Sequence, residues 1–276
     1  MEYVIVNGEI IKKEEANFTS FFWNNPLIFT KEIWFGFGGI PLFAENLEQL
    51  KDQLQSLGTN TPALFLNQRE FFRRIKRMLN KNRFYRTGLI YIQLLISNSK
   101  TDFVLLATPF EETEFKYREK GVLTEFAKTH KYSKTPLLIS DYTKRIFDRL
   151  DGAKDEDSSA KNFIFLNERG MVCDAGPANV FFIQKNVLMT PSLPTGCVPD
   201  HLRKLVLEAA GALKLQLRES DEILPESIFK MEEIFFAGEA TGIQWVLGIE
   251  TKRFVHHISG EIHNELNKIL KSKVVN

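Results

Sequence analysis

Apolar residues in this chain come in short runs of strand length, and turn signals separate one run from the next. One such run covers residues 180–183, and a turn at residues 168–170 precedes it. These runs alternate with segments whose apolar residues recur every three to four positions, as amphipathic helices require. No run approaches the roughly 18 apolar residues of a membrane helix. The pattern predicts an α+β fold.

Length and charge narrow the class of protein further. The 276 residues and the hydrophobic fraction of 43% allow two domains with sizeable cores. The 36 basic and 35 acidic residues nearly balance, so the formal charge of +1 implies no nucleic-acid partner. Basic residues cluster at 73–77, but at helical spacing, which favours a solvated helix face.

The two cysteines, Cys173 and Cys197, are too few for a disulfide framework or a zinc cluster, so we expect no metal site. The chain opens without a basic and apolar leader. We therefore expect a cytoplasmic protein with no membrane partner.

Residues 1–110 are predicted to form a smaller N-terminal α+β domain. The dipeptide Asn7-Gly8 supplies positive φ at both corners of a type I′ turn, so residues 3–11 are predicted as two paired strands. Residues 32–43 are predicted as a second strand pair that bends at two consecutive glycines. Residues 88–97 and 102–110 are predicted as further strands. The helix after residue 43 is predicted to bury one face, formed by Leu47, Leu50, Leu54 and Leu57.

The segment 109–121 is charged and begins with proline, so a linker is predicted at residues 111–117. Residues 118–276 are predicted as a larger C-terminal α+β domain. Its expected elements are a helix from 141 to about 154 and a strand meander over 161–191. A further helix is predicted to begin after Asp200, which is placed to cap its N-terminus.

A single acid, Asp174, lies among small residues just before the apolar run 180–183. Acids at such positions are often turn formers; the alternative is a carboxylate that holds a base or a cationic ring. The nearest nucleophile candidate is Lys144, thirty residues upstream. Its basic neighbours Lys134 and Arg145 favour the neutral amine that Schiff-base chemistry requires, although a lone lysine is usually exposed surface.

A turn containing proline and glycine, residues 191–199, runs directly into the helix that Asp200 is predicted to cap. Such an entry leaves backbone N–H groups directed at whatever precedes the helix, which suits a cofactor phosphate. An ordinary loop-to-helix entry is the commoner alternative.

The order of these motifs resembles one family. The segments "LNERGMVCDAGPANVFFI", "TPSLPTGC" and "FFAGEATGIQWV" are similar to motifs of the class IV aminotransferases, or fold type IV pyridoxal-phosphate enzymes. The family includes branched-chain and D-amino-acid aminotransferases and 4-amino-4-deoxychorismate lyase. The resemblance implies a two-domain fold like that of D-amino-acid aminotransferase, a homodimer and pyridoxal 5′-phosphate as cofactor. The implied substrate is a small amino compound, either an amino acid or aminodeoxychorismate.

The resemblance also implies roles for particular residues. Lys144 would form the Schiff base with the cofactor aldehyde, and Asp174 would keep the pyridine nitrogen protonated. The other implied cofactor contacts are Asn179, His201, Leu202, Gly238 and Glu239. Transamination or elimination of pyruvate would follow, and the sequence does not choose between them.

Three positions depart from the family where it contacts the phosphate. Gln49 stands in place of arginine, Asp200 in place of glycine, and Gly238 or Glu239 in place of threonine. An aspartate at that helix entry would itself satisfy the N–H groups and repel a phosphate. Two hypotheses remain. The first is a pyridoxal-phosphate aminotransferase or lyase with a rebuilt phosphate site. The second is a cofactor-free homologue that retains the fold as a binding or interaction protein.

Overall fold

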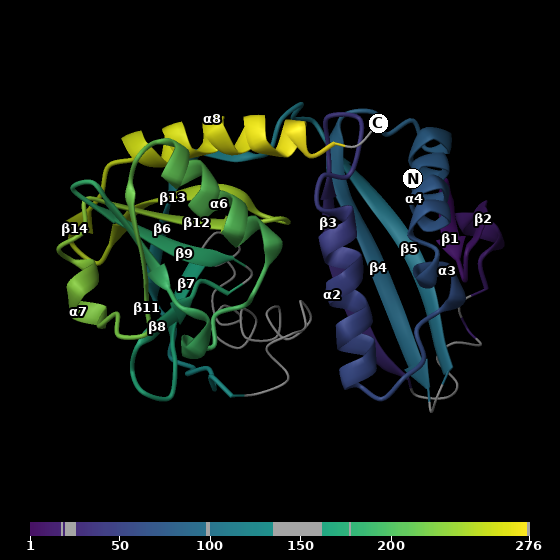
Figure 1. The fold of residues 1–276 in the computed structure, drawn as a ribbon, viewed down its shortest axis with the longest axis horizontal. Helices are drawn as coiled ribbons and strands as arrows, with labels where there is room; N and C mark the ends of the chain where they lie inside the picture. Colours follow the sequence, from purple (N-terminus) through teal and green to yellow (C-terminus); the bar gives the residue numbers. More distant parts are fainter. Residues whose placement is uncertain (18, 20–25, 98–99, 135–161, 177, 275–276) are drawn as a thin grey trace. The chain divides into compact units, whose positions relative to one another are not determined.

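The computed structural model describes residues 1–276 except 18, 20–25, 98–99, 135–161, 177 and 275–276 (Figure 1). The chain divides into two compact units, the first Met1–Glu114 with Lys271–Asn276 and the second Phe115–Leu270. The sequence assigned all of residues 118–276 to one domain, whereas the last residues cluster with the first unit.

The described part of the first unit contains a five-stranded sheet in the order β2-β1-β5-β4-β3. β1 (Tyr3–Val6) pairs antiparallel with β2 (Glu9–Lys12), and both turn residues, Asn7 and Gly8, have positive φ. The hairpin predicted from this dipeptide is therefore confirmed. β4 (Thr87–Ser97) and β5 (Lys100–Phe110) are the two strands predicted over 88–97 and 102–110, and they pair antiparallel with each other.

The strand pair predicted over residues 32–43 is wrong. β3 (Leu27–Phe35) ends before the glycines and pairs over its whole length with β4. Only an isolated bridge, between Gly36 and Gly39, closes the turn that follows. Phe37 and Gly38 both adopt positive φ, as in a hairpin turn, but a helix begins at Phe43 and leaves too few residues for a second strand.

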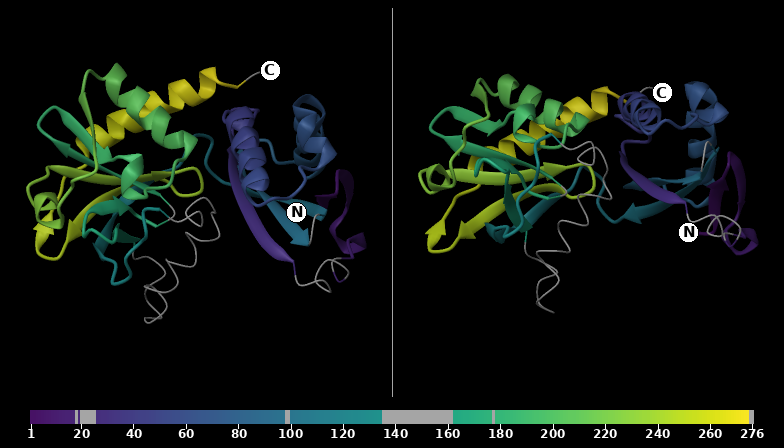
Figure 2. Two further views of the ribbon diagram at one scale, coloured as in Figure 1. Left: turned by 60° about the horizontal axis from the view of Figure 1, so that its bottom comes forward. Right: turned by 90° about the horizontal axis from the view of Figure 1, so that it is seen from below.

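Helices cover one side of this sheet, as the two views in Figure 2 show. α2 (Phe43–Ser56) and α4 (Gln68–Lys81) are joined through the short α3 (Ala63–Leu66), and η1 (Lys13–Glu15) follows β2. Leu57, predicted to lie on the buried face of α2, is 46% exposed because the helix ends one residue earlier. Asn67 caps α4 by accepting a hydrogen bond from the Glu70 N–H at 3.1 Å.

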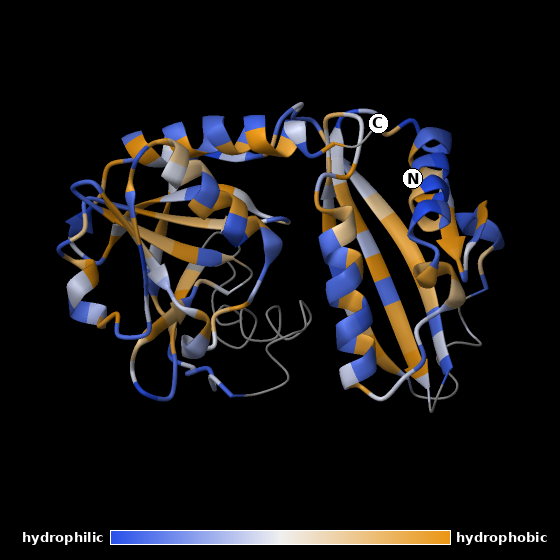
Figure 3. Cartoon of the chain, in the orientation of Figure 1, coloured by the Kyte–Doolittle hydropathy of each residue, from blue (hydrophilic) through white to orange (hydrophobic). Residues whose placement is uncertain are grey.

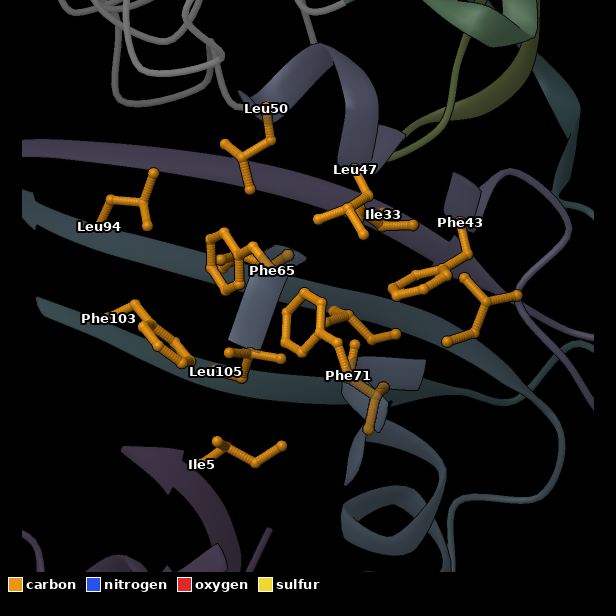
Figure 4. Close-up of a cluster of buried hydrophobic side chains, with 14 of the residues drawn as sticks. Ile5, Ile33, Phe43, Leu47, Leu50, Phe65, Phe71, Leu94, Phe103 and Leu105 are labelled. Atoms are coloured by element: carbon orange, nitrogen blue, oxygen red, sulfur yellow. The ribbon is translucent and has the colours of Figure 1, made fainter. Parts of the chain in front are cut away.

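Aromatic rings fill the space between these helices and the sheet (Figure 4). Phe65 stacks on Phe71 with ring centroids 4.6 Å apart and lies 4.8 Å from Phe103 of β5. Strand residues contribute at every second position, as a pleated strand with one covered face requires. On β4 these residues are Ile90, Ile92, Leu94 and Ile96.

The described part of the second unit contains a nine-stranded mixed sheet in the order β11-β10-β9-β12-β13-β6-β7-β8, with β14 beside β13. β6 pairs in parallel with both β7 and β13, and β10 pairs in parallel with β11. The strands are β6 (Tyr117–Phe126), β7 (Asn162–Leu166), β8 (Val172–Asp174), β9 (Asn179–Gln184), β10 (Val187–Pro191), β11 (Gln216–Ser220), β12 (Glu233–Gly238), β13 (Gly242–Ile249) and β14 (Lys252–Arg253).

The meander predicted over residues 161–191 is interrupted in its middle. β7 pairs with β8 and β9 pairs with β10, but β9 takes β12 as its other neighbour. A tight turn closed by Ala175 and Ala178 separates β8 from β9, and Gly176 has a φ of 67°. Asp174 is the residue immediately before this turn.

Helix α6 (His201–Ala212) begins where the sequence predicted, with Asp200 as its N-cap. The other helical elements are η4 (Leu193–Thr195), α7 (Pro225–Ile228) and α8 (His257–Ser272). Colouring by hydropathy shows α8 banded and α4 mostly hydrophilic (Figure 3). Within the described ranges, no helix is both long enough and apolar enough to cross a bilayer. The helix predicted from residue 141 to about 154 lies outside those ranges.

Candidate functional site

The site in the second unit is built around a buried ion pair that the sequence did not predict. The Lys131 Nζ lies 2.5 Å from the Asp174 Oδ1, and each side chain is 1% exposed. The two residues are 43 positions apart. Asp174 is held at the end of β8, and Lys131 lies beyond the end of β6, in a parallel bridge with Asn167.

Backbone contacts fix both partners of this ion pair. The Lys131 N–H donates to the Leu166 carbonyl at 2.9 Å, and the Gly176 N–H donates to the Asp174 Oδ1 at 3.1 Å. The Lys131 amine also lies 4.4 Å from the centroid of the Phe165 ring, where a cation is attracted by the ring face. The Asp174 Oδ2 is buried and accepts no hydrogen bond from the described residues.

The segment that carries Lys131 is attached to the β7–β8 turn by a second contact. Ser133 donates from its backbone N–H to the Glu168 Oε2 at 2.8 Å, and from its hydroxyl to the Oε1 at 2.5 Å. These hydrogen bonds lower the pKa of Glu168. The amine is therefore positioned by backbone pairing on one side and by this side-chain clamp on the other.

Asn167 connects the same turn to the loop that precedes α6. Its Oδ1 accepts from the N–H groups of Arg169 and Met171, each at 3.0 Å, and its Nδ2 donates to the Thr195 carbonyl at 3.1 Å. The side chain is fully buried. An asparagine that opens a turn containing glycine is a turn signal, and the sequence shows it at residues 167–170. The sequence does not show that Asn167 also contacts Thr195.

The N-terminus of α6 is occupied by a carboxylate of the chain itself. The Asp200 Oδ1 accepts from the Arg203 N–H at 2.7 Å, and its Oδ2 accepts from the Asn179 Nδ2 at 2.9 Å. The Asn179 Oδ1 is buried and has no hydrogen-bond partner among the described residues. Asp200 thus satisfies the N–H group that an anion would otherwise contact.

The Arg203 guanidinium lies away from that helix entry. Its Nη2 donates to the Pro191 carbonyl at 2.7 Å and to the Glu219 Oε2 at 2.6 Å, and the residue is 5% exposed. Arginine buried in this way ties α6 to β10 and β11. These contacts make Arg203 a structural cation in the second unit.

The remaining predicted site residues are distributed as follows. Leu202 is fully buried and His201 is half-buried at the first turn of α6. Gly238 ends β12 in a pair with Gly242, and Glu239 follows it, 9% exposed. Lys144 lies outside the described residues, so its predicted role stays a prediction.

The structure also places both thiols and a second buried lysine. Burial raises the pKa of Cys173 well above its ordinary value and that of Cys197 to about 11, so neither thiol is an activated nucleophile. In the first unit, the Lys31 Nζ donates to the Gln49 Oε1 at 2.9 Å, and Lys31 is 6% exposed. Lys31 is the second buried lysine that the sequence reasoning missed.

The comparisons with known proteins agree on one family. The family model described as amino-transferase class IV matches residues 37–249. A probable branched-chain-amino-acid aminotransferase from Thermotoga maritima is 26% identical over 113 residues. That match covers 41% of this chain and 41% of the relative, so the chain aligns with less than half of the relative's length.

Solved structures extend the likeness to nearly the whole chain. The pyridoxal-phosphate form of branched-chain amino acid aminotransferase from Thermobaculum terrenum has a TM-score of 0.83 at 16% identity and covers 99% of this chain and 94% of its own. A putative 4-amino-4-deoxychorismate lyase from Legionella pneumophila has a TM-score of 0.74 at 18% identity, with 88% and 91% covered. At these identities the likeness establishes the fold.

Proposed function

This chain belongs to the class IV aminotransferase family, and we propose that it is a member that does not use pyridoxal phosphate and retains the fold as a binding protein. The observation that carries the proposal is the buried contact between the Lys131 amine and the Asp174 carboxylate. The described residues do not meet two chemical requirements of the cofactor, one at its ring nitrogen and one at its phosphate.

The ring nitrogen is the first place. The resemblance gives Asp174 the task of holding that nitrogen protonated, which requires the carboxylate to face the ring. Its Oδ1 instead neutralises Lys131 at 2.5 Å, and the side chain is 1% exposed. The aldehyde carbon and the nitrogen lie on opposite sides of a pyridine ring. While this contact is made, the carboxylate is not available to the ring nitrogen, and the amine does not lie at the aldehyde end of the ring.

The phosphate is the second place. Asp200 directs its carboxylate at the first turn of α6, where the family has glycine by resemblance. Two unit negative charges about 4 Å apart repel by roughly 1 kcal/mol in water and about 4 kcal/mol at an effective dielectric constant near 20. Replacing the family arginine by Gln49 would remove about 1.5–3 kcal/mol of charge-assisted hydrogen bonding. Each factor weakens cofactor binding, and together they amount to several orders of magnitude in affinity.

A working pyridoxal-phosphate enzyme is the second candidate, and two observations favour it. The buried Asp174 Oδ2 accepts no hydrogen bond from the described residues and would suit a protonated ring nitrogen. Lys31 brings a buried cation next to Gln49, the position of the family arginine. Under this candidate the substrate is an amino acid or aminodeoxychorismate, and Lys144 supplies the amine. The homodimer and the cytoplasmic location are expectations under either candidate.

Cofactor mapping tests the proposal. The purified protein would be incubated with pyridoxal phosphate, reduced with borohydride, digested and mapped by mass spectrometry. We expect scattered, substoichiometric labelling of surface lysines, the same in wild type and in Lys144→Ala. One adduct per chain on a single lysine, with an absorbance band near the visible edge that Lys144→Ala abolishes, contradicts the proposal and establishes the second candidate.

A gain-of-binding variant separates the phosphate from the ring. Asp200→Gly removes the competing carboxylate, and glycine is tolerated at an N-cap at a cost of only a few tenths of a kcal/mol. We expect Asp200→Gly to bind pyridoxal phosphate about tenfold more tightly than wild type in equilibrium dialysis. Equal affinity of the two proteins would show that Asp200 does not exclude the phosphate.

A further inference from the structure

A pocket that belongs wholly to the first unit is lined by none of the residues discussed for the cofactor. Its volume is about 860 Å³, and it lies between the first turns of α2 and α4 and the C-terminal segment of the chain. Pockets of about 300–1,000 Å³ hold small organic ligands. From its lining we infer that this pocket binds a small amphipathic anion, a carboxylate carried on an alkyl or aromatic body. This inference goes beyond the proposed function and does not depend on it.

Hydrophobic side chains supply the body of the site. Phe43 and Phe72 meet edge to face with centroids 5.3 Å apart, and Ile40 lies beside them in the lining. Phe43 and Ile40 are 5% and 4% exposed, so their positions are set by the core behind them. An aromatic floor of this kind favours an apolar ligand group and excludes a fully hydrated ion.

The charged side chains in the lining are mostly cations. Arg69 and Arg73 are four residues apart on α4, so they project from the same face of the helix, and Lys273 faces them from the C-terminal segment. One carboxylate in the lining, Glu45, lies 3.4 Å from the Lys273 Nζ and offsets that charge. The two arginines therefore give the lining a net positive charge. Arg73 shares the Glu70 carboxylate with a neighbour and is 59% exposed, which leaves its guanidinium accessible to a ligand.

The C-terminal wall of the pocket is held by close packing. A Cβ added at Gly39 would lie 2.5 Å from the Val274 Cγ1, so the segment that carries Lys273 rests directly on this glycine. An apolar floor under an arginine pair matches a ligand with one negative end and one hydrophobic end. A cationic ligand of the same length would meet like charge at the rim.

Titration calorimetry with decanoate tests the site, and decyltrimethylammonium serves as the matched ligand of opposite charge. We expect saturable binding of one decanoate per chain, weakened at high salt because the rim is exposed. The double variant Arg69→Gln/Arg73→Gln should weaken it about tenfold. Arg77→Gln, an exposed arginine of the same helix outside the lining, should leave it unchanged. Ala44→Trp, which places a large ring in the pocket, should abolish binding while circular dichroism shows intact folding.

Three results would overturn the inference: no saturable decanoate binding, equal affinity for the two ligands, or full affinity in the folded Ala44→Trp variant. None of these readouts involves pyridoxal phosphate. Failure here is therefore distinguishable from failure of the proposed function, which is measured by cofactor labelling.

Discussion

Replacing Lys131 by methionine removes the amine from the buried ion pair and keeps most of the side-chain volume. Both partners are 1% exposed and in contact at 2.5 Å, so the change leaves an uncompensated carboxylate at Asp174 that water does not reach. Breaking a buried pair by removing one partner costs about 3–5 kcal/mol. For a unit of this size, a change of 1 kcal/mol moves Tm by about 2–4 °C, so we expect a loss of roughly 6–20 °C.

The assay must report on the second unit alone, because two units need not unfold together. Trp245 lies on β13 of that unit, while Trp34 lies on β3 of the first. In a background in which Trp23 and Trp34 are replaced by phenylalanine, the fluorescence of Trp245 would follow unfolding of the second unit in urea and by heat. Lys134→Met removes an exposed lysine three residues along the chain and is the matched control, with an expected change within about 0.5 kcal/mol.

A double-mutant cycle completes the measurement. Lys131→Met/Asp174→Asn removes both charges, and it should be more stable than Lys131→Met because no buried ion is left unpaired. If Lys131→Met matches the Lys134→Met control, or if the cycle gives a coupling energy near zero, the ion pair does not stabilise the second unit. That result would also contradict the proposed function, in which Lys131 occupies the Asp174 carboxylate.

Three other perturbations have clear expected outcomes. Asp200→Ala removes the cap of α6 and should lower the free energy of unfolding of the second unit by about 1 kcal/mol, measured by Trp245 fluorescence in urea; an unchanged midpoint would contradict the capping role. Burial raises the pKa of Cys197 from 9.0 to about 11, so the protonated thiol stabilises the fold fully below pH 9 and this contribution is lost as the pH rises toward 11. Between pH 9 and 11 the free energy of unfolding should therefore fall less steeply for Cys197→Ala than for wild type. Gly88→Ala would place a Cβ 2.2 Å from the Thr108 carbonyl oxygen and should destabilise the first unit by about 1–3 kcal/mol, followed through Trp34; wild-type stability would mean that the strands can separate to admit it.

Much of the fold was predictable because its signals are local. Asn7-Gly8 specifies a hairpin through the positive φ of both residues, and Asp200 is recognisable as a cap from the helix that follows it. Both depend on interactions within a few residues of the chain. The two wrong strand predictions, the strand pair over 32–43 and the unbroken meander over 161–191, concern strand partners. Strand partners are chosen by pairing with distant segments, which local patterns do not encode.

The sequence by itself determined the family, the two candidate hypotheses and the position of the critical carboxylate. Only the tertiary structure decided what Asp174 contacts. Lys131 reaches it from 43 residues away because β6 and β7 pair in parallel, which carries the end of one strand alongside the end of the other. Parallel pairing joins segments that are separated by a long crossover, so no spacing rule in the sequence relates the two residues. The contact exists because register in a sheet, and not distance along the chain, sets which charges are buried together.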